Sequence, residues 1–352
     1  MKKAVMYGAG NIGKGFMGQL FFQNGYNTVF IDINPDVIDA LNRDKAYPIK
    51  IVSNKDRHEM IIKDVSGIHG MDTNAVAEEI ARCDIMCTAV GVNVLPKIVP
   101  NLANGIKLRS QTGRPLNIII CENKIDANLY LKQMIKEYLP QEYHSFIEDK
   151  VGFIEASVGR MVPVVTDEMK EGNLLRVWVE PFCTLPVDKE AFKGEIPKID
   201  GMVPENNFEY YIQSKLFLHN MGHSLTAYLG KLNGYTYIYE AIGNKNIKTL
   251  VQNAMYAAAK ALSAEHHKPY YEVKRYANDL IDRFGNRYLG DTIDRVGKDL
   301  KRKLGENDRL LGAIRLCEKH HIDALYIKVG VAAALLFGEE YEIKELKMEV
   351  ML

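Results

Sequence analysis

The chain has 352 residues, and its 45 Lys and Arg side chains balance 45 Asp and Glu side chains, so its formal net charge is zero. This length is typical of roughly two domains of ~150 residues each. A composition of 47% apolar and 26% charged residues excludes long disordered, collagen-like and low-complexity chains. Neutrality argues against nucleic acid or a membrane surface as the main partner. We expect a small-molecule ligand and a monomer or small homo-oligomer.

The cysteines and histidines show no pattern typical of a disulfide framework or a metal site. The five cysteines are odd in number and form no paired C-x-x-C motifs, so reduced thiols in a cytoplasmic protein are the expectation. The adjacent histidines at 266–267 and 320–321 would point about 100° apart on a helix and would not converge on an ion. The longest apolar run, 329–337, is about half of the ~18 residues that span a bilayer. We therefore expect neither a metal ion nor a membrane span.

The N-terminal segment alternates predicted strands and helices. Residues 4–7 form a short apolar run typical of a buried strand, and residues 14–24 carry apolar positions at helical spacing. Residues 28–31 predict a second strand that ends at Asp32. Residues 35–41 predict a helix with Asn34 as its N-terminal cap.

The alternation continues to about residue 181. Alternating apolar residues within 47–70 indicate a small antiparallel excursion. Beyond it we predict helices at 74–82 and 95–103, and strands at 84–90, 116–121, 151–157 and 176–181. Repeated strand–helix units favour an α/β fold with a doubly wound parallel sheet of the Rossmann type.

The C-terminal part changes character, because helical spacing replaces β-branched alternation from Asn206 onward. We predict helices at 206–230, 235–242, 246–264, 271–283, 291–302, 307–321 and 324–337. The stretch 194–205, with two glycines and two prolines, is the predicted linker. The expected organisation is a nucleotide-binding domain over residues 1–195 and an all-helical substrate-binding and catalytic domain over residues 196–352, with the active site between them.

A glycine-rich turn follows the first predicted strand. Gly8, Gly10 and Gly13 form a G-x-G-x-x-G motif that opens a helix. Asp32 ends the next strand about 20 residues later, as in dinucleotide-binding folds. The first glycine permits a tight turn, the second the close approach of a pyrophosphate, and the third close packing of helix on strand. The unpaired N–H groups at the helix start can bind the phosphates.

The cofactor predicted from this motif is NAD. Asp32 can accept hydrogen bonds from both adenosine ribose hydroxyls and would repel a 2′-phosphate, which disfavours NADP. Small residues after the fourth strand, at 88–91, would let a nicotinamide ribose lie across the carboxyl edge of the sheet. The predicted cofactor-binding residues are Gly8, Gly10, Asn11, Ile12, Gly13, Asp32, Thr88 and Val90.

The predicted helix over 206–230 carries four polar side chains in an otherwise apolar sequence. At about 100° per residue all four lie within one face, near 0°, 40°, 80° and 140° for Lys215, His219, His223 and Asn220. A dehydrogenase needs a group that moves a proton and donors for the developing oxyanion. A lysine acts as the base when burial lowers its pKa from ~10.4 towards neutrality. A solvated helix face is the alternative interpretation.

This helix reads K-x4-N-x2-H from Lys215 to His223. Further motifs follow the chain order: Gly8–Phe16, Cys121–Asn123, Arg283–Asn286, Tyr288–Asp291, Arg295–Gly297, Lys303–Leu304 and Asp308–Leu310. Together they resemble the polyol-specific long-chain dehydrogenases (the mannitol dehydrogenase family), most of all the branch that acts on mannitol phosphates. The resemblance implies NAD-dependent oxidation of a polyol phosphate, with mannitol 1-phosphate converted to fructose 6-phosphate as the first choice.

The resemblance also implies residue roles. Lys215 would be the general acid/base, and Asn123 and Asn220 would hold the substrate oxygen. His223 would bind a neighbouring hydroxyl and help to orient Lys215.

Two basic residues complete the set that the resemblance implies. Arg295 and Lys303 would contact the far end of the substrate, where a sugar phosphate carries a dianion. Without the resemblance, this basic segment would be interpreted as an exposed helix end.

The sequence departs from the family pattern at 158–160, which reads V-G-R with Gly159 where the family usually has Asp. An acid near the substrate is therefore missing unless Glu155 or Asp167 replaces it. The loop after Asn123 lacks the N-G of many relatives, and the chain is expected to end some tens of residues before typical members.

The alternatives are a related hexonate or free-polyol dehydrogenase, 6-phosphogluconate dehydrogenase or ketopantoate reductase, and a catalytically inactive NAD-binding regulatory protein. The complete lysine–asparagine–histidine set argues against the last three, and Gly159 keeps the first open.

Overall fold

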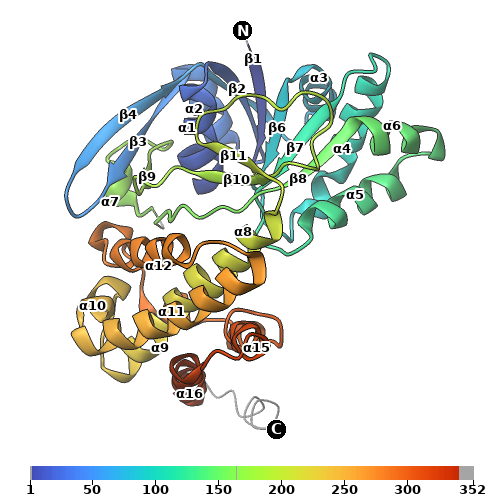
Figure 1. Cartoon of the computed structure of the whole chain (residues 1–352). Helices are drawn as coiled ribbons and strands as arrows, with labels where there is room; N and C mark the ends of the chain where they lie inside the picture. The colour runs from blue at the N-terminus through green and yellow to red at the C-terminus, as the bar shows by residue number, and fades with distance from the viewer. Residues whose placement is uncertain (1, 164, 341–352) are drawn as a thin grey trace. The chain divides into compact units, whose positions relative to one another are not determined.

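The computed structural model describes residues 2–163 and 165–340. The chain divides into two compact units, Met1–Phe208 and Glu209–Leu352. Figure 1 shows a β-sheet with flanking helices in the first unit and helices in the second, which confirms the expected fold class. The first unit extends beyond residue 195 because the stretch 194–205 is not a linker. It contains β11 (Met202–Glu205), which pairs in parallel with β10 (Leu185–Asp188).

A six-stranded sheet forms the centre of the first unit. Its strands are β1 (Lys2–Tyr7), β2 (Tyr26–Asp32), β5 (Val65–His69), β6 (Ile85–Thr88), β7 (Leu116–Ile120) and β8 (Val151–Glu155). They lie in the order β5-β2-β1-β6-β7-β8, and every pair is parallel. This is the Rossmann order, in which ligands bind at the carboxyl ends of the strands where the order reverses, here at β1 and β6.

Helices cover both faces of this sheet because alternate residues of its strands point to opposite sides. In β1, Ala4 and Met6 belong to one apolar cluster, whereas Val5 and Tyr7 belong to the other. Helices η1, α1 and α2 supply the first cluster, and α3, α4 and α5 supply the second. The helices of this unit are η1 (Gly13–Met17), α1 (Gly18–Gln23), α2 (Pro35–Asp44), α3 (Thr73–Arg82), α4 (Leu95–Ser110), α5 (Ala127–Tyr138), η2 (Gln141–Tyr143), α6 (His144–Lys150) and α7 (Asp167–Lys170).

The antiparallel excursion expected within 47–70 is present, but it is shorter. Strands β3 (Ala46–Val52) and β4 (Arg57–Lys63) pair antiparallel, and β9 (Val177–Val179) pairs with β3 in parallel. The last strand of the segment, β5, instead joins the main sheet beside β2. Gly67 permits this placement, since a Cβ there would lie 2.9 Å from Ile38 of α2.

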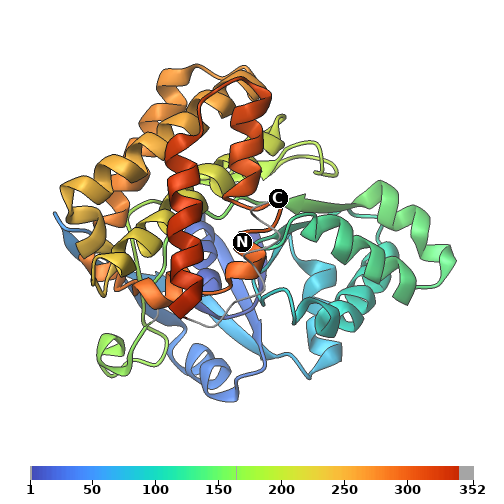
Figure 2. The same ribbon diagram turned by 90° about the horizontal axis from the view of Figure 1, so that it is seen from below.

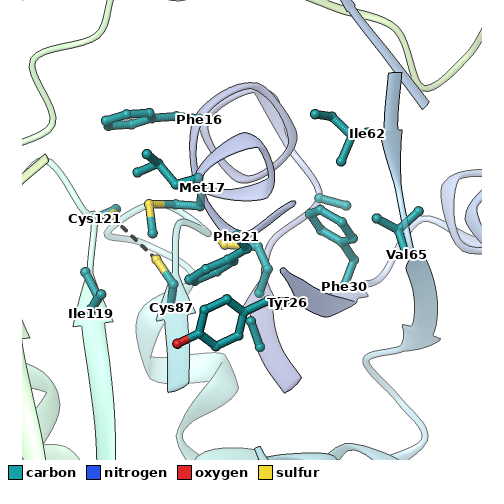
Figure 3. Packing of buried hydrophobic residues seen from close by; sticks show 14 of the residues in the cluster. Phe16, Met17, Phe21, Tyr26, Phe30, Ile62, Val65, Cys87, Ile119 and Cys121 are labelled. Atoms are coloured by element: carbon teal, nitrogen blue, oxygen red, sulfur yellow. Dashed lines mark hydrogen bonds between the residues drawn. The ribbon is translucent and has the colours of Figure 1, made fainter. Parts of the chain in front are cut away.

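The first helix packs an aromatic face onto the sheet. It begins as the π-helical segment η1 and continues as α1. Figure 3 shows Phe16, Met17 and Phe21 in the buried cluster with Phe30 of β2. Burying each large side chain contributes on the order of 2 kcal/mol, so the start of this helix is held firmly against the sheet.

The second unit is built around α9. This helix packs against α10, α11, α13 and α16, and Figure 2 shows the orange and red helices of this unit from below. Helices over this part of the chain are α8 (Phe208–Ser214), η3 (Lys215–Asn220), α9 (Met221–Leu232), α10 (Ile238–Gly243), α11 (Lys245–His266), α12 (Tyr270–Phe284), η4 (Arg287–Leu289), α13 (Ile293–Gly297), α14 (Leu300–Lys303), α15 (Leu311–Lys319) and α16 (Leu325–Glu340). Within residues 2–163 and 165–340, no helix is long and apolar enough to cross a membrane.

Candidate active site

The glycine motif forms a tight turn between β1 and η1. Gly8 has a φ of +104°, a conformation that favours glycine, and a Cβ there would lie 2.5 Å from the carbonyl oxygen of Ala89. A Cβ at Gly13 would lie 2.0 Å from the carbonyl oxygen of Gly8. A side chain at either position would therefore force the turn away from the sheet.

Gly10 differs from these two glycines in its surroundings. Among the described residues, nothing lies within 4 Å of the position that a Cβ would occupy. Asn11 is exposed and Ile12 is half-buried. Packing therefore does not require a glycine here. The absence of a side chain at this helix start instead lets a phosphate group approach the backbone N–H donors. These residues therefore fit the pyrophosphate of a dinucleotide.

Asp32 lies beside this turn at the end of β2. Its Oδ2 accepts a 2.7 Å hydrogen bond from the Ala9 N–H, and its Oδ1 accepts a 3.0 Å bond from the Asn34 N–H. These bonds fix the carboxylate, yet each oxygen retains a further acceptor site. The half-buried side chain can therefore still accept hydrogen bonds from ribose hydroxyls.

Thr88 and Val90 are both held by Glu122. The Thr88 hydroxyl donates to Oε2 of Glu122 at 2.8 Å, and the Val90 N–H donates to Oε1 at 3.0 Å. Burial raises the pKa of Glu122, and these two hydrogen bonds lower it in part. Thr88 is fully buried, so it shapes the loop through Glu122 and is not itself open to a ligand.

Two loops at the carboxyl ends of β7 and β8 carry the remaining predicted residues of this unit. Asn123 is exposed in the loop after β7. The V-G-R segment follows β8, and its Arg160 is buried. Arg160 donates to the carbonyl oxygen of Gly15 at 2.9 Å and to Oε1 of Gln19 at 2.7 Å. The V-G-R loop is thereby fastened to the first helix.

The two acids considered as replacements for the missing aspartate lie in different settings. Glu155 is the last residue of β8 and is half-buried. Asp167 begins α7, where its exposed carboxylate pairs with Lys170 at 2.7 Å. Of the two, only Glu155 lies at the carboxyl edge of the sheet.

The polar helix of the second unit contains a π-helical segment that α-helical spacing does not predict. Residues Lys215–Asn220 form η3, and α9 continues it. The Met221 N–H donates to the carbonyl oxygen of Leu216, five residues earlier. In this register Asn220 follows Lys215 by about one turn, so the two side chains lie closer in angle than the ~140° of an α-helix. Such segments are frequent at functional sites.

The four polar residues of this helix do not share one environment. Lys215, Asn220 and His223 are half-buried, whereas His219 is buried. Burial holds the pKa of His219 well below its usual range, and the positive charge of Arg283 lowers it further. His219 is therefore a neutral packing residue, and the polar line consists of the other three.

His223 and Arg295 share one carboxylate partner. His223 Nε2 lies 3.3 Å from Oδ2 of Asp291, and the Arg295 guanidinium pairs with Oδ1 of the same residue. The His223 ring stacks on Phe284 with centroids 5.1 Å apart and an interplanar angle of 11°. The structure thus links a predicted catalytic residue to a predicted substrate-binding residue through Asp291.

Lys303 is buried, so the interpretation as an exposed helix end does not hold for this residue, whereas Arg295, Lys301 and Arg302 are exposed. Its Nζ donates to the carbonyl oxygen of Val296, the residue after Arg295. Burial lowers the pKa of Lys303 to about 8, and the neighbouring Arg309 and Arg302 act in the same direction. Lys303 is thus a buried cation bonded to the segment that carries Arg295. Two such cations are suited to binding an anionic ligand.

The His, Cys, Asp and Glu side chains that the structure describes form no cluster of three or more that could hold a metal ion. His266 instead contacts Oε1 of Gln213 at 3.0 Å, and His320 contacts Oε2 of Glu265 at 2.7 Å.

Three residues with a place in the site were not predicted. Glu122 and Asp291 lie inside the motifs that carry the family resemblance, and that position was the available signal. Lys14, directly after the last glycine of the motif, is buried. Burial lowers the pKa of Lys14 to about 8, and the charge of Asp32 opposes that shift. Helical spacing alone did not distinguish Lys14 from a surface lysine.

The fold and these residues define a Rossmann-type nucleotide-binding unit joined to a helical unit with a lysine–asparagine–histidine line. The model of the mannitol dehydrogenase Rossmann domain matches residues 2–201, and that of the mannitol dehydrogenase C-terminal domain matches residues 207–351. The chain belongs to the mannitol dehydrogenase family, as the sequence motifs predicted.

Curated relatives match nearly the whole chain. A mannitol-1-phosphate 5-dehydrogenase of Thermoanaerobacter pseudethanolicus is 37% identical, over 99% of this chain and 89% of its own length. One of Oceanobacillus iheyensis is 36% identical, over 99% and 90%. Among solved structures, D-sorbitol dehydrogenase in substrate-free form has a TM-score of 0.81 at 15% identity, covering 94% of this chain and 79% of that one. The Pseudomonas fluorescens mannitol 2-dehydrogenase ternary complex has a TM-score of 0.72 at 16% identity, with 96% and 79% covered.

Proposed function

We propose that the protein catalyses the NAD-dependent, reversible oxidation of mannitol 1-phosphate to fructose 6-phosphate. The observation that carries this proposal is the 33–37% identity, over at least 98% of the chain, to relatives named mannitol-1-phosphate 5-dehydrogenase. The two cations Arg295 and Lys303, the second bonded to the residue after the first, support a phosphorylated substrate over a neutral polyol.

The first unit supplies the cofactor site in this proposal. The helix that begins after Gly10 offers N–H donors and a partial positive charge to the pyrophosphate. Asp32 binds the adenosine ribose and disfavours a 2′-phosphate by like-charge repulsion. NAD is therefore the proposed cofactor, and its nicotinamide ring supplies a hydride acceptor when bound.

The half-buried residues of the second unit carry the proton chemistry. Lys215, in its neutral form, takes the proton from the substrate hydroxyl as the carbon–hydrogen bond breaks, and returns it in the reverse reaction. The amides of Asn220 and Asn123 donate hydrogen bonds to the oxygen as its negative charge develops. His223 binds the neighbouring hydroxyl and helps to orient Lys215.

The nearest alternative is oxidation of a hexonate or a free polyol. Gly159 favours it, because an acid that normally lies near the substrate is absent and Asp167 is engaged with Lys170. A substrate with different hydroxyl or carboxylate positions would meet a different environment there.

A substrate panel separates these candidates. NADH consumption would be followed with fructose 6-phosphate, fructose, tagaturonate and fructuronate under identical conditions. We expect turnover with fructose 6-phosphate and much less with the other three. Turnover with a keto-uronate but none with fructose 6-phosphate would overturn the substrate assignment.

The lysine assignment has its own test. Replacing Lys215 with Ala should lower kcat by about 10² to 10⁴, the usual contribution of general acid–base catalysis. Lys231, half-buried at the end of α9 and paired with Asp294 at 3.2 Å, provides the matched control. A Lys215→Ala protein as active as Lys231→Ala would contradict the assigned role.

Two coarser expectations belong to the same proposal. Free thiols at all five cysteine positions support a cytoplasmic enzyme. A monomer or small homo-oligomer without a nucleic-acid partner remains the prediction from the neutral composition, and sizing chromatography with light scattering checks it.

A further inference from the structure

Asp291 is a buried carboxylate, 8% exposed, in the short connection between η4 and α13. One of its oxygens faces His223 Nε2 at 3.3 Å, and the other pairs with the guanidinium of Arg295. A buried carboxylate is costly unless it is paired and hydrogen-bonded. Its two partners come from different helices, α9 and α13, so it joins elements that are otherwise separate in sequence.

The backbone around Asp291 is fixed by hydrogen bonds to the start of α10. The carbonyl oxygen of Asp291 accepts from the Ile238 N–H at 2.9 Å, and the Ile293 N–H donates to the carbonyl oxygen of Thr236 at 2.9 Å. Tyr237 and Thr292 form an antiparallel bridge between these bonds. The carboxylate therefore projects from a rigid position.

The same short segment begins the helix that carries Arg295. The Thr292 hydroxyl accepts a 3.3 Å hydrogen bond from the Arg295 N–H, which caps α13. The position of Arg295 relative to Asp291 is therefore set by the first turn of a helix whose cap, Thr292, directly follows Asp291.

His223 is constrained from two directions. Phe284 covers one face of its ring, and Asp291 lies against its Nε2 edge. A carboxylate beside one ring nitrogen favours the proton on that nitrogen and leaves the other as an acceptor. The ring plane is thus constrained and one tautomer is favoured, as suits a residue that binds a substrate hydroxyl.

We propose that Asp291 is a positioning residue for catalysis, which fixes the ring orientation and tautomer of His223 and holds Arg295 ready for the anionic end of the substrate. This rests on the proposed function for the substrate contacts of His223 and Arg295. Asp291 itself touches neither substrate nor cofactor. Its negative charge also offsets that of Arg295 until a phosphate group takes over as the partner.

The proposal predicts a split between kinetic constants for Asp291→Asn. An amide places an N–H₂ group or an uncharged oxygen against His223 Nε2, so the preferred tautomer is lost. We expect kcat to fall by about 10- to 100-fold, as when a carboxylate that orients a histidine is removed. KM for fructose 6-phosphate should stay within about threefold or fall, because the capped turn of α13 still holds Arg295 in place and Asp291 no longer offsets its charge.

Asp294, in the first turn of α13, provides the matched control. It is exposed and pairs with Lys231, so Asp294→Asn removes the same charge three residues away without touching His223. Its kcat and KM should remain those of the parent. Equal losses in both variants would refute a specific role for Asp291.

Nitrogen-15 NMR of the histidine side chains gives a readout that does not depend on activity. The parent should show His223 protonated on Nε2, and Asp291→Asn should shift it towards the Nδ1 tautomer or a mixture. The same tautomer in both proteins would overturn the proposal, even if kcat had fallen.

A double-mutant cycle covers the case in which Asp291→Asn is poorly folded. Circular dichroism and thermal unfolding would identify that case, and the comparison is then made within a His223→Asn background. If Asp291 acts through His223, its replacement there should change kcat by less than twofold; a further large loss would oppose the proposal. Absence of fructose 6-phosphate turnover in the parent would instead reject the proposed function, and the tautomer measurement would still test Asp291.

Discussion

The Tyr47 hydroxyl donates a 2.8 Å hydrogen bond to the backbone carbonyl oxygen of Lys14 in the first helix. In an α-helix, the Gly18 N–H would donate to that carbonyl. Here it donates to Gly13, one residue earlier, and so forms the π-helical segment η1. Tyr47 is fully buried on β3. A strand outside the main sheet thus fixes the geometry of the helix that follows the glycine motif.

Tyr47→Phe should therefore destabilise the protein and weaken NAD binding together. The change leaves the buried Lys14 carbonyl without this donor, which costs about 1–3 kcal/mol. Urea unfolding measures that loss, and calorimetric titration of NAD measures the affinity. An unchanged affinity would show that η1 keeps its geometry without Tyr47.

Gly18 offers a second test of the same contact. A Cβ at this position would lie 2.1 Å from the Tyr47 hydroxyl oxygen, so Gly18→Ala should be destabilising on its own. In a Tyr47→Phe background the clashing oxygen is gone. The double variant should be more stable than the sum of the two single losses predicts, and additive losses in urea unfolding would exclude the clash as the cause.

Arg160→Lys should loosen the V-G-R loop from the nucleotide helix. Lysine cannot reproduce the fork that bonds both Gly15 and Glu180 carbonyl oxygens. We expect the Kd for NAD to rise by about tenfold, or ~1.4 kcal/mol, together with a loss of stability.

Arg109→Lys is the matched control for that variant. Arg109 is as deeply buried as Arg160 and bonds the backbone carbonyls of Cys83 and Pro115, which precede β6 and β7 at the other end of the sheet. It should lose comparable stability while keeping the NAD affinity of the parent. Parallel changes in both variants would indicate a general loss of packing.

Much of the first unit could be predicted because its signals are local. Gly8, Gly13 and Asp32 have the spacing that the turn requires, and the cap at Asn34 is present as expected, with Oδ1 accepting from two N–H groups of α2. The placement of β5 could not be predicted, since the pairing partner of a strand depends on contacts such as Gly67 against Ile38.

The site in the second unit was predicted in its residues but not in its geometry. Spacing at 100° per residue describes an α-helix, and no residue type in 215–220 signals the i→i+5 register of η3. Asp291 could not be assigned a role for a related reason. Its carboxylate meets His223 across 68 positions of sequence, a pairing that only the tertiary fold creates.

Asp32→Ala should relax cofactor preference. The carboxylate that repels a 2′-phosphate is removed, and the buried Lys14, whose charge interacts with Asp32, then attracts one. The ratio of kcat/KM for NADP to that for NAD should rise by at least tenfold. Asp36→Asn, at an exposed position on α2, is the control and should leave the ratio unchanged. An unchanged ratio in Asp32→Ala would show that Asp32 does not contact the ribose.

Lys303→Met should weaken substrate binding without lowering the stability of the protein at neutral pH. Because burial lowers the pKa of Lys303 to about 8, below its unfolded value of ~10.4, the folded state bears the cost of a buried ammonium at neutral pH. Above pH 8 the unfolded chain binds more protons than the folded one, so that cost declines as pH rises. Lys303→Met should thus be at least as stable as the parent at pH 7, and any difference in Tm should change in the parent's favour towards pH 10.

The same ammonium binds phosphate only when it is protonated. KM of the parent for fructose 6-phosphate should therefore rise as pH passes 8, and Lys303→Met should show a KM raised by tenfold or more at pH 7 with no such rise. Lys301→Met, at an exposed position on α14, is the control for charge alone, and its KM should follow that of the parent. If Lys301→Met and Lys303→Met raised KM equally, long-range attraction rather than direct contact would account for the effect, and Lys303 would lose its place in the substrate site.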